Sequence, residues 1–153
     1  MSYGESLLSR VVDDNDVTAL TRYGVDREHF ATEAERQAYD FIHRYAEQNG
    51  GEAPSYATLV SETDITYIPD VSDSFEYLAR QLKSQAAKVQ AKQMIEQRLG
   101  EKFEKLDGNE FLEWLIDETE RIKMRTHVRK TVGTNIKKDT DKFLHEYEKR
   151  KSG

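Results

Sequence analysis

Cysteine is absent from the 153-residue sequence, which excludes disulfide bonds and thiolate metal sites. The absence agrees with a reducing compartment, and we expect a cytoplasmic location. Only two prolines, Pro54 and Pro69, and eight glycines interrupt the chain, and so few helix breakers favour an α-rich fold. No apolar run approaches the roughly 18 residues of a membrane span, and the N-terminus MSYGESLLSR does not resemble a signal peptide. We therefore expect no membrane contact.

Motifs that mark enzyme active sites are absent as well. The four histidines are scattered and form neither an H-E-x-x-H motif nor an i, i+4 pair: His29, His43, His127 and His145. The sequence has no G-x-S-x-G elbow, no G-x-x-x-x-G-K-[ST] phosphate loop and no G-x-G-x-x-G fingerprint. We therefore predict that this chain is not an enzyme and has no catalytic, metal or cofactor-binding residues.

Charge is divided unevenly along the chain. The net charge is −6, but residues 1–120 hold 12 Lys or Arg against 25 Asp or Glu, a balance of −13. Residues 121–153 hold 11 basic against 4 acidic residues, a balance of +7. This division is compatible with two solvated faces of opposite sign. It is equally compatible with a basic end that acts as a linker, a docking segment or a nucleic-acid contact.

Residues 73–106 predict one long helix around which the chain is organised. They contain no proline and many strong helix formers, and Asp73 with Glu76 fits a capping box. Such a helix would be roughly 50 Å long at about 1.5 Å per residue. The apolar residues of this segment fall on a seven-residue repeat: Phe75, Leu78, Leu82, Val89, Leu99, Phe103 and Leu106. The middle of the repeat is polar, so we expect the two halves of the helix to pack on different bodies. Gly100 is a candidate bend or end.

Residues 1–72 are predicted to form a compact helical head. Thr32 with Glu35 fits a capping box, and Ser55 is placed to cap a short helix. Residues 63–72 read as a loop, with a short strand as the alternative. The side chains expected inside the head follow helical spacing: Leu7, Leu8, Val11, Val12, Val17, Leu20, Ala38, Phe41, Ile42, Tyr45, Leu59 and Val60.

Residues 107–128 predict a helix that returns along the long one, so that residues 73–128 end in an antiparallel helical hairpin. Asp107 or Asn109 is its expected cap. The apolar stripes of the two arms are too long to satisfy each other, and we predict self-association through Leu99, Phe103, Phe111, Leu112, Leu115 and Ile116. Trp114 either covers the hairpin's core or anchors a partner.

Residues 129–153 are interpreted as a linker with a docking helix. Gly133 breaks the helical pattern, and Asn135 can cap a last helix over 136–150. Its apolar face, expected to dock on a partner domain, consists of Ile136, Phe143, Leu144 and Tyr147. Acidic residues alternate with the lysines of this helix, so we expect only weak or indirect DNA contact.

The order of these pieces resembles the N-terminal domain of the DnaB-family replicative helicases of bacteria and their phages. The main similarity is SFEYLARQLKSQA at 74–86, which is like the family segment that opens the long helix. GESLLSRVVDD at 4–14 is similar to the opening helix, with Gly4 where an acidic residue is usual. VDREHF and APSYATL resemble the family's next turn and helix, with Ser55 or Tyr56 in place of an aspartate. The resemblance covers residues 4–126 at low identity.

The resemblance implies an all-α head, a protruding hairpin and a linker helix that docks on the motor domain of a neighbouring subunit. Such domains form the collar of a hexameric ring, often as a trimer of dimers, and receive the primase and sometimes a helicase loader. They do not hydrolyse ATP, which binds to the motor domain that follows them. The alternative is a free-standing adaptor or regulator of bacterial or phage DNA replication that binds acidic or nucleic-acid partners through residues 121–151.

Overall fold

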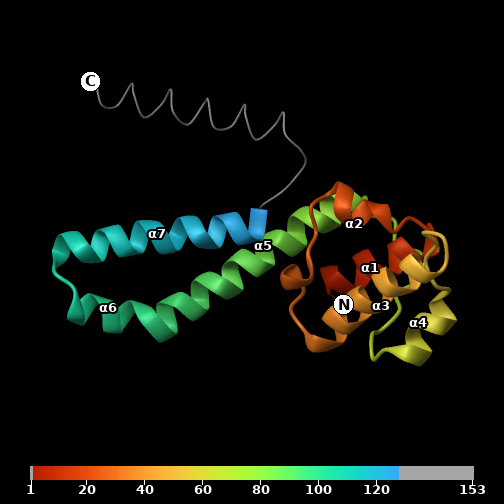
Figure 1. The fold of residues 1–153 in the computed structure, drawn as a ribbon, viewed down its shortest axis with the longest axis horizontal. Coiled ribbons are helices and arrows are strands. Elements are labelled where there is room, and N and C mark those ends of the chain that lie inside the picture. The colour runs from red at the N-terminus through yellow and green to blue at the C-terminus, as the bar shows by residue number, and fades with distance from the viewer. Residues whose placement is uncertain (1, 128–153) are drawn as a thin grey trace, which may run out of the picture.

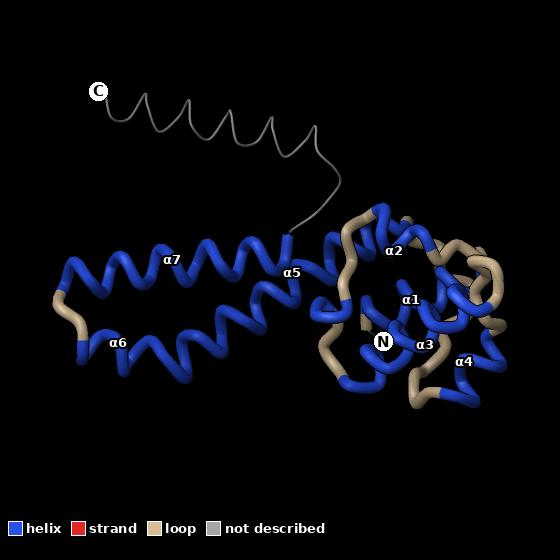
Figure 2. Tube along the Cα trace, in the orientation of Figure 1, coloured by secondary structure: helices blue, strands red, loops and turns tan. Residues whose placement is uncertain are grey.

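The computed structural model describes residues 2–127, and every regular element in that range is a helix (Figures 1 and 2). The predicted all-α fold, with a compact head followed by a long helix and an antiparallel hairpin, is confirmed. The predicted helix over 136–150 lies outside the described residues.

The head contains four α-helices: α1 (Tyr3–Asp13), α2 (Thr18–Arg22), α3 (Glu33–Gln48) and α4 (Tyr56–Glu62). A short 3-10 turn, η1 (Arg27–His29), connects α2 to α3. The helices enclose one apolar core, to which α5 also contributes: Leu7, Leu8, Val11, Val12, Val17, Leu20, Val25, Phe30, Ala38, Ile42, Ala46, Leu59, Ile65, Leu78, Ala79 and Leu82.

The predicted interior of the head is mostly confirmed, with one error on α4. Leu59 is 1% exposed, but Val60, which we expected to point inward, is 40% exposed. Consecutive helical residues point about 100° apart, so a helix of seven residues that buries Leu59 against α1 and α3 must turn Val60 away. Phe41 and Tyr45 of α3 are only half-buried.

Local capping signals are realised at two of the predicted helix starts in the head. Thr32 Oγ1 accepts from Glu35 N at 3.1 Å, and the Glu35 carboxylate accepts from Thr32 N at 3.0 Å, which completes the predicted capping box. Ser55 Oγ accepts from Thr58 N at 3.2 Å and so caps α4.

The long helix begins one residue later than predicted. Ser74, and not Asp73, is the N-cap of α5 (Phe75–Met94), because Ser74 Oγ accepts from Tyr77 N at 3.1 Å. The carbonyl of Asp73 instead accepts a hydrogen bond from the Arg10 guanidinium of α1. Serine is as good an N-cap as aspartate, so cap preference alone does not choose between the two neighbours.

The helix continues past α5 without a break. A π-helical segment, η2 (Ile95–Leu99), leads into α6 (Gly100–Lys105), and Gly100 itself has helical dihedrals (φ −62°, ψ −41°). Gly100 therefore does not end the helix, and the irregularity lies in the five residues before it. After a short turn, α7 (Gly108–His127) runs back beside α6 and α5 and forms the predicted hairpin (Figure 1).

The buried stripe of the long helix differs from the predicted seven-residue repeat. Its buried residues are Leu78, Ala79, Leu82, Lys83, Ala86 and Met94, whereas Val89 is 46% exposed. No side chain of η2 or α6 is buried, so the buried stripe ends at Met94, before the π-segment. As expected, the first half packs on the head through α1 and the second half on α7.

Candidate interaction surfaces

The hairpin projects from the head (Figure 1), and large apolar side chains on it are exposed. Phe103 is 69% exposed, Leu112 55% and Ile116 58%, and all three belong to the predicted self-association set. Exposed aliphatic and aromatic side chains that cluster on one projecting element are typical of protein–protein contacts. We call these residues, together with Ile95, the hairpin patch.

The other three predicted residues, Leu99, Phe111 and Leu115, are half-buried. Phe111 packs edge-on against Phe103, with ring centroids 5.4 Å apart, and lies 6.1 Å from the ring of Trp114. Leu99, Phe111 and Leu115 are thus partly covered within the subunit. Half-buried Trp114, in contact with Phe111, covers part of the hairpin's own apolar surface.

Ile95 was missed by the sequence analysis, although it is 54% exposed. It falls outside the predicted seven-residue repeat, which places Glu96 on the stripe at this turn.

An ion-pair cluster joins the two arms of the hairpin. Glu118 of α7 is 2% exposed and pairs with Arg98 of the π-segment and with Arg121, whose Nη1 lies 3.2 Å from Glu118 Oε2. Both guanidinium groups remain about half-exposed to water, which lowers the cost of burying the carboxylate between them. No sequence motif marks this cluster, because Arg98 and Glu118 meet only when the hairpin closes.

The base of the hairpin is fixed to the head through His29, which is 2% exposed. Its Nδ1 accepts from Asp26 N at 2.8 Å, so Nε2 carries the proton of the neutral ring. Nε2 lies 3.0 Å from the carbonyl of Thr126, near the end of α7, and donates to it. Burial lowers the pKa of His29, and the positive charge of Lys83 adds to this effect, whereas Asp26 opposes it.

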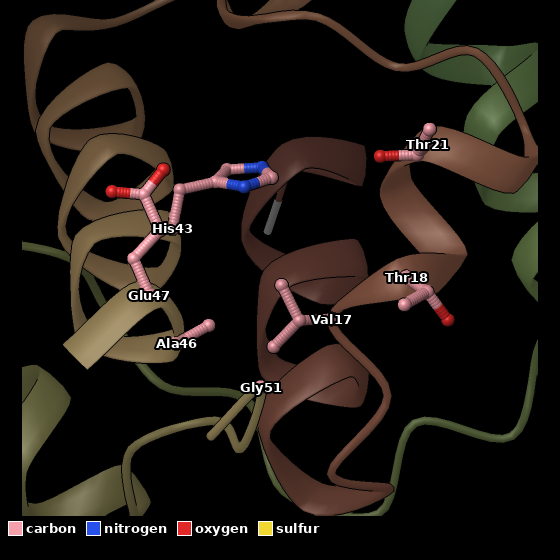
Figure 3. Close-up of a pocket in the computed structure, with 7 residues that line it drawn as sticks. All are labelled: Val17, Thr18, Thr21, His43, Ala46, Glu47 and Gly51. Carbon is pink, nitrogen blue, oxygen red and sulfur yellow. The ribbon is translucent and has the colours of Figure 1, made fainter. Parts of the chain in front are cut away.

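A shallow hollow of about 410 Å³ lies between α2 and the end of α3 (Figure 3). It is lined by Val17, Thr18, Thr21, His43, Ala46, Glu47 and Gly51. The His43 ring packs 4.4 Å from Tyr39, and its Nε2 is buried without a hydrogen-bond partner within residues 2–127. Burial lowers the pKa of His43, and nearby Glu47 and Asp40 oppose this.

His43 and Glu47 share the hollow with two threonines, but no side chain here is hydrogen-bonded to His43 as a nucleophile would be to its base. Within residues 2–127 no three His, Asp or Glu side chains converge as a metal site. No helix in this range is both long and apolar enough to cross a membrane.

Compared with protein-family models, curated proteins and solved structures, the chain shows no significant match. What the protein does must therefore be inferred from its surfaces. The hairpin patch lies within the described residues, whereas the predicted docking residues Ile136, Phe143, Leu144 and Tyr147 lie outside them.

Proposed function

We propose that this chain is a non-catalytic assembly and partner-binding domain, the collar of a hexameric replicative DNA helicase. The observation that carries the proposal is the hairpin patch, an apolar surface on an element that projects from the head. A projecting hairpin contributes little to the core of its own subunit. Its exposed apolar side chains are suited to pack against an equivalent hairpin of a second subunit.

The free energy available from such pairing is modest. Burying the remaining exposed half of a large apolar side chain gains on the order of 1 kcal/mol. Four such residues on each of two hairpins would gain on the order of 8 kcal/mol, which is comparable with the cost of association. Pairing by hairpins alone would be weak or moderate, and closure of a ring would add the remaining stabilisation.

Two further features support the helicase part of the proposal. The order of elements along residues 4–126, including SFEYLARQLKSQA at the start of the long helix, resembles the helicase family. The predicted helix over 136–150 is amphipathic, as a linker that docks on a neighbouring motor domain would be. On this proposal the head and the outer surface of the collar receive a primase and a loader, and the ATPase motor belongs to a following domain.

Sedimentation of the chain tests the hairpin contact. At about 100 μM we expect a dimer or larger species, and Phe103→Asp with Ile116→Asp should convert it to a monomer because two charges would enter each half of the contact. Val89→Asp with Met124→Asp is the matched control, since it places the same charges on exposed apolar positions outside the hairpin patch. A wild-type monomer at this concentration, or equal dissociation in the control, would refute the proposal.

The uneven charge favours a second candidate, an adaptor that binds through its basic end. Residues 121–153 carry a net charge of +7, whereas the rest of the chain is acidic. The continuation of the reading frame after Gly153 distinguishes the two candidates. A G-x-x-x-x-G-K-[ST] phosphate loop within about a hundred residues would favour the helicase collar, and a stop codon would favour the adaptor.

A further inference from the structure

One stretch of the head carries acidic residues without any basic ones. Between Arg44 and Arg80 the sequence has no Lys or Arg, but it has seven exposed carboxylates: Glu47, Glu52, Glu62, Asp64, Asp70, Asp73 and Glu76. None of them forms an ion pair within residues 2–127. This stretch includes α4, which lies on the side of the head away from the hairpin tip (Figure 1). We call the surface of residues 45–79 the acidic face; Arg10 of α1, which donates to the Asp73 carbonyl, is a basic group at its edge.

The acidic face has an apolar centre on α4. Tyr56 is 53% exposed and Val60 40% exposed, and their spacing of four places them on one side of the helix. The ring of Tyr56 stacks on that of Tyr67 at 4.7 Å, and the Tyr67 hydroxyl donates to the Asp13 carboxylate at 2.8 Å. The aromatic pair is therefore held in position before any partner binds, which reduces the entropy cost of binding.

A surface of this composition suits a segment that is basic and has one apolar side. Unpaired carboxylates attract lysine and arginine, and an exposed tyrosine gains most when an apolar group covers its ring. Residues 129–153 of this chain match both requirements. They hold eight Lys or Arg against four Asp or Glu, and their predicted apolar face includes Phe143 and Leu144.

We propose that residues 129–153 dock on the acidic face of their own chain. Phe143 and Leu144 would cover Tyr56 and Val60, and the lysines would lie among the surrounding carboxylates. The preceding helix ends on the hairpin side of the head, where the Thr126 carbonyl contacts His29, and α4 lies on the other side, so residues 128–135 must span the head before the docking helix begins. A short tether of this kind raises the effective concentration to the millimolar range, at which even a weak contact forms.

This contact goes beyond the proposed function and competes with part of it. In a helicase collar the same apolar side chains would dock on a neighbouring motor domain, so the two contacts exclude each other. The acidic face would then hold the segment until the motor domain replaces it. Each exposed ion pair contributes little, so the intramolecular contact should be weak enough to exchange and sensitive to salt.

Amide hydrogen exchange of the full chain in dilute solution at about 20 mM salt tests the contact. In the wild type we expect slow exchange across residues 136–150, and about tenfold faster exchange after Glu62→Lys with Asp64→Lys. The matched control is Glu113→Lys with Asp117→Lys, which makes the same charge change on exposed positions of α7 and should leave exchange slow. Adding Lys137→Glu with Lys138→Glu to the first variant should restore slow exchange, because the charges are then swapped.

Zero-length carbodiimide cross-linking shows which copy supplies the segment. Amide bonds should join lysines of 136–150 to carboxylates of the acidic face, and a mixture of ¹⁴N and ¹⁵N chains should give cross-links within one label only. Mixed-label cross-links would refute docking on the same chain. Fast exchange across 136–150 in the wild type, or slow exchange that the acidic-face variant leaves unchanged, would refute the docking itself. Neither result would alter the sedimentation test of the hairpin.

Discussion

Ser2 Oγ donates a hydrogen bond to Glu35 Oε1 over 2.8 Å and so connects the caps of two helices. Ser2 is the N-cap of α1, and Glu35 completes the capping box of α3 through its other carboxylate oxygen, which accepts from Thr32. The Glu35 side chain is therefore buried, at 3% exposure, with hydrogen bonds from both helices. It fixes the start of α1 against the start of α3.

Removing this carboxylate should destabilise the head. We expect Glu35→Ala to lower the free energy of unfolding by about 2–3 kcal/mol, since Ser2 and Thr32 lose their acceptor and a cavity remains. Chemical denaturation measured by circular dichroism gives the difference. Glu33→Ala, two residues away and exposed, should change stability by no more than about 0.5 kcal/mol. Equal effects of the two substitutions would show that Glu35 has no special role.

Gly4 is required beside that carboxylate. A Cβ atom at position 4 would lie 2.2 Å from Glu35 Oε1 and 3.0 Å from the Phe30 ring, too close for either group. Because Glu35 is held by several hydrogen bonds, it cannot simply move away. This close approach requires glycine at position 4.

We expect Gly4→Ala to destabilise the chain by about 1–3 kcal/mol, although alanine is the better helix former. In the Glu35→Ala background the clash with the carboxylate is gone, so the same substitution should be much less harmful. A double-mutant cycle from denaturation midpoints measures this coupling. Additive effects would contradict the close approach seen here.

Local signals in the sequence were sufficient for most of the fold. The capping box at Thr32 and Glu35, the cap at Ser55 and the apolar spacing of α1 each depend on residues within one or two helical turns. The exposure of Val60 and Val89 was predicted wrongly, because it depends on which side of a helix the rest of the molecule covers. A cap can also be misplaced by one residue, as at Asp73, when two neighbouring residues are equally good N-caps.

The features that join the elements could not be predicted from spacing. His29 and Thr126 are 97 residues apart, and Ser2 and Glu35 are 33 residues apart. Their hydrogen bonds form only after the helices have packed. The hairpin patch was predicted in part, since Phe103, Leu112 and Ile116 belong to the predicted self-association set, whereas Ile95 lies next to the repeat and was missed.

The contact between His29 and Thr126 predicts how stability depends on pH. The folded protein keeps His29 neutral, and its pKa is below the usual value of 6.5 because the ring is buried. Protonation therefore favours the unfolded chain. The free energy of unfolding should be constant above about pH 7 and should fall as the pH drops from 6.5 through the lowered pKa, by at most about 1.4 kcal/mol per pH unit for this group.

Denaturation between pH 5 and 8 checks this expectation. His29→Gln should be less stable at pH 8, since it loses the ring packing, but its stability should fall less toward pH 5. His43, whose pKa is also lowered by burial, contributes a similar slope that should survive in this variant. An identical pH profile for wild type and His29→Gln would show that His29 is not held neutral.

The cluster around Glu118 predicts that the hairpin can be loosened without unfolding the head. Glu118→Gln keeps the shape of the side chain but removes the charge that pairs with Arg98 and Arg121. Breaking a buried ion pair from one side is costly, but both arginines here reach water, so we expect a loss of about 1–3 kcal/mol. Because the head core includes no residue of α7, the loss should appear as faster amide exchange in residues 95–127, with the exchange of α1 and α3 unchanged.

Glu120→Gln, two residues further on and exposed, is the matched control. Uniformly faster exchange across the head and hairpin would mean that the two unfold together and that the cluster stabilises the whole domain.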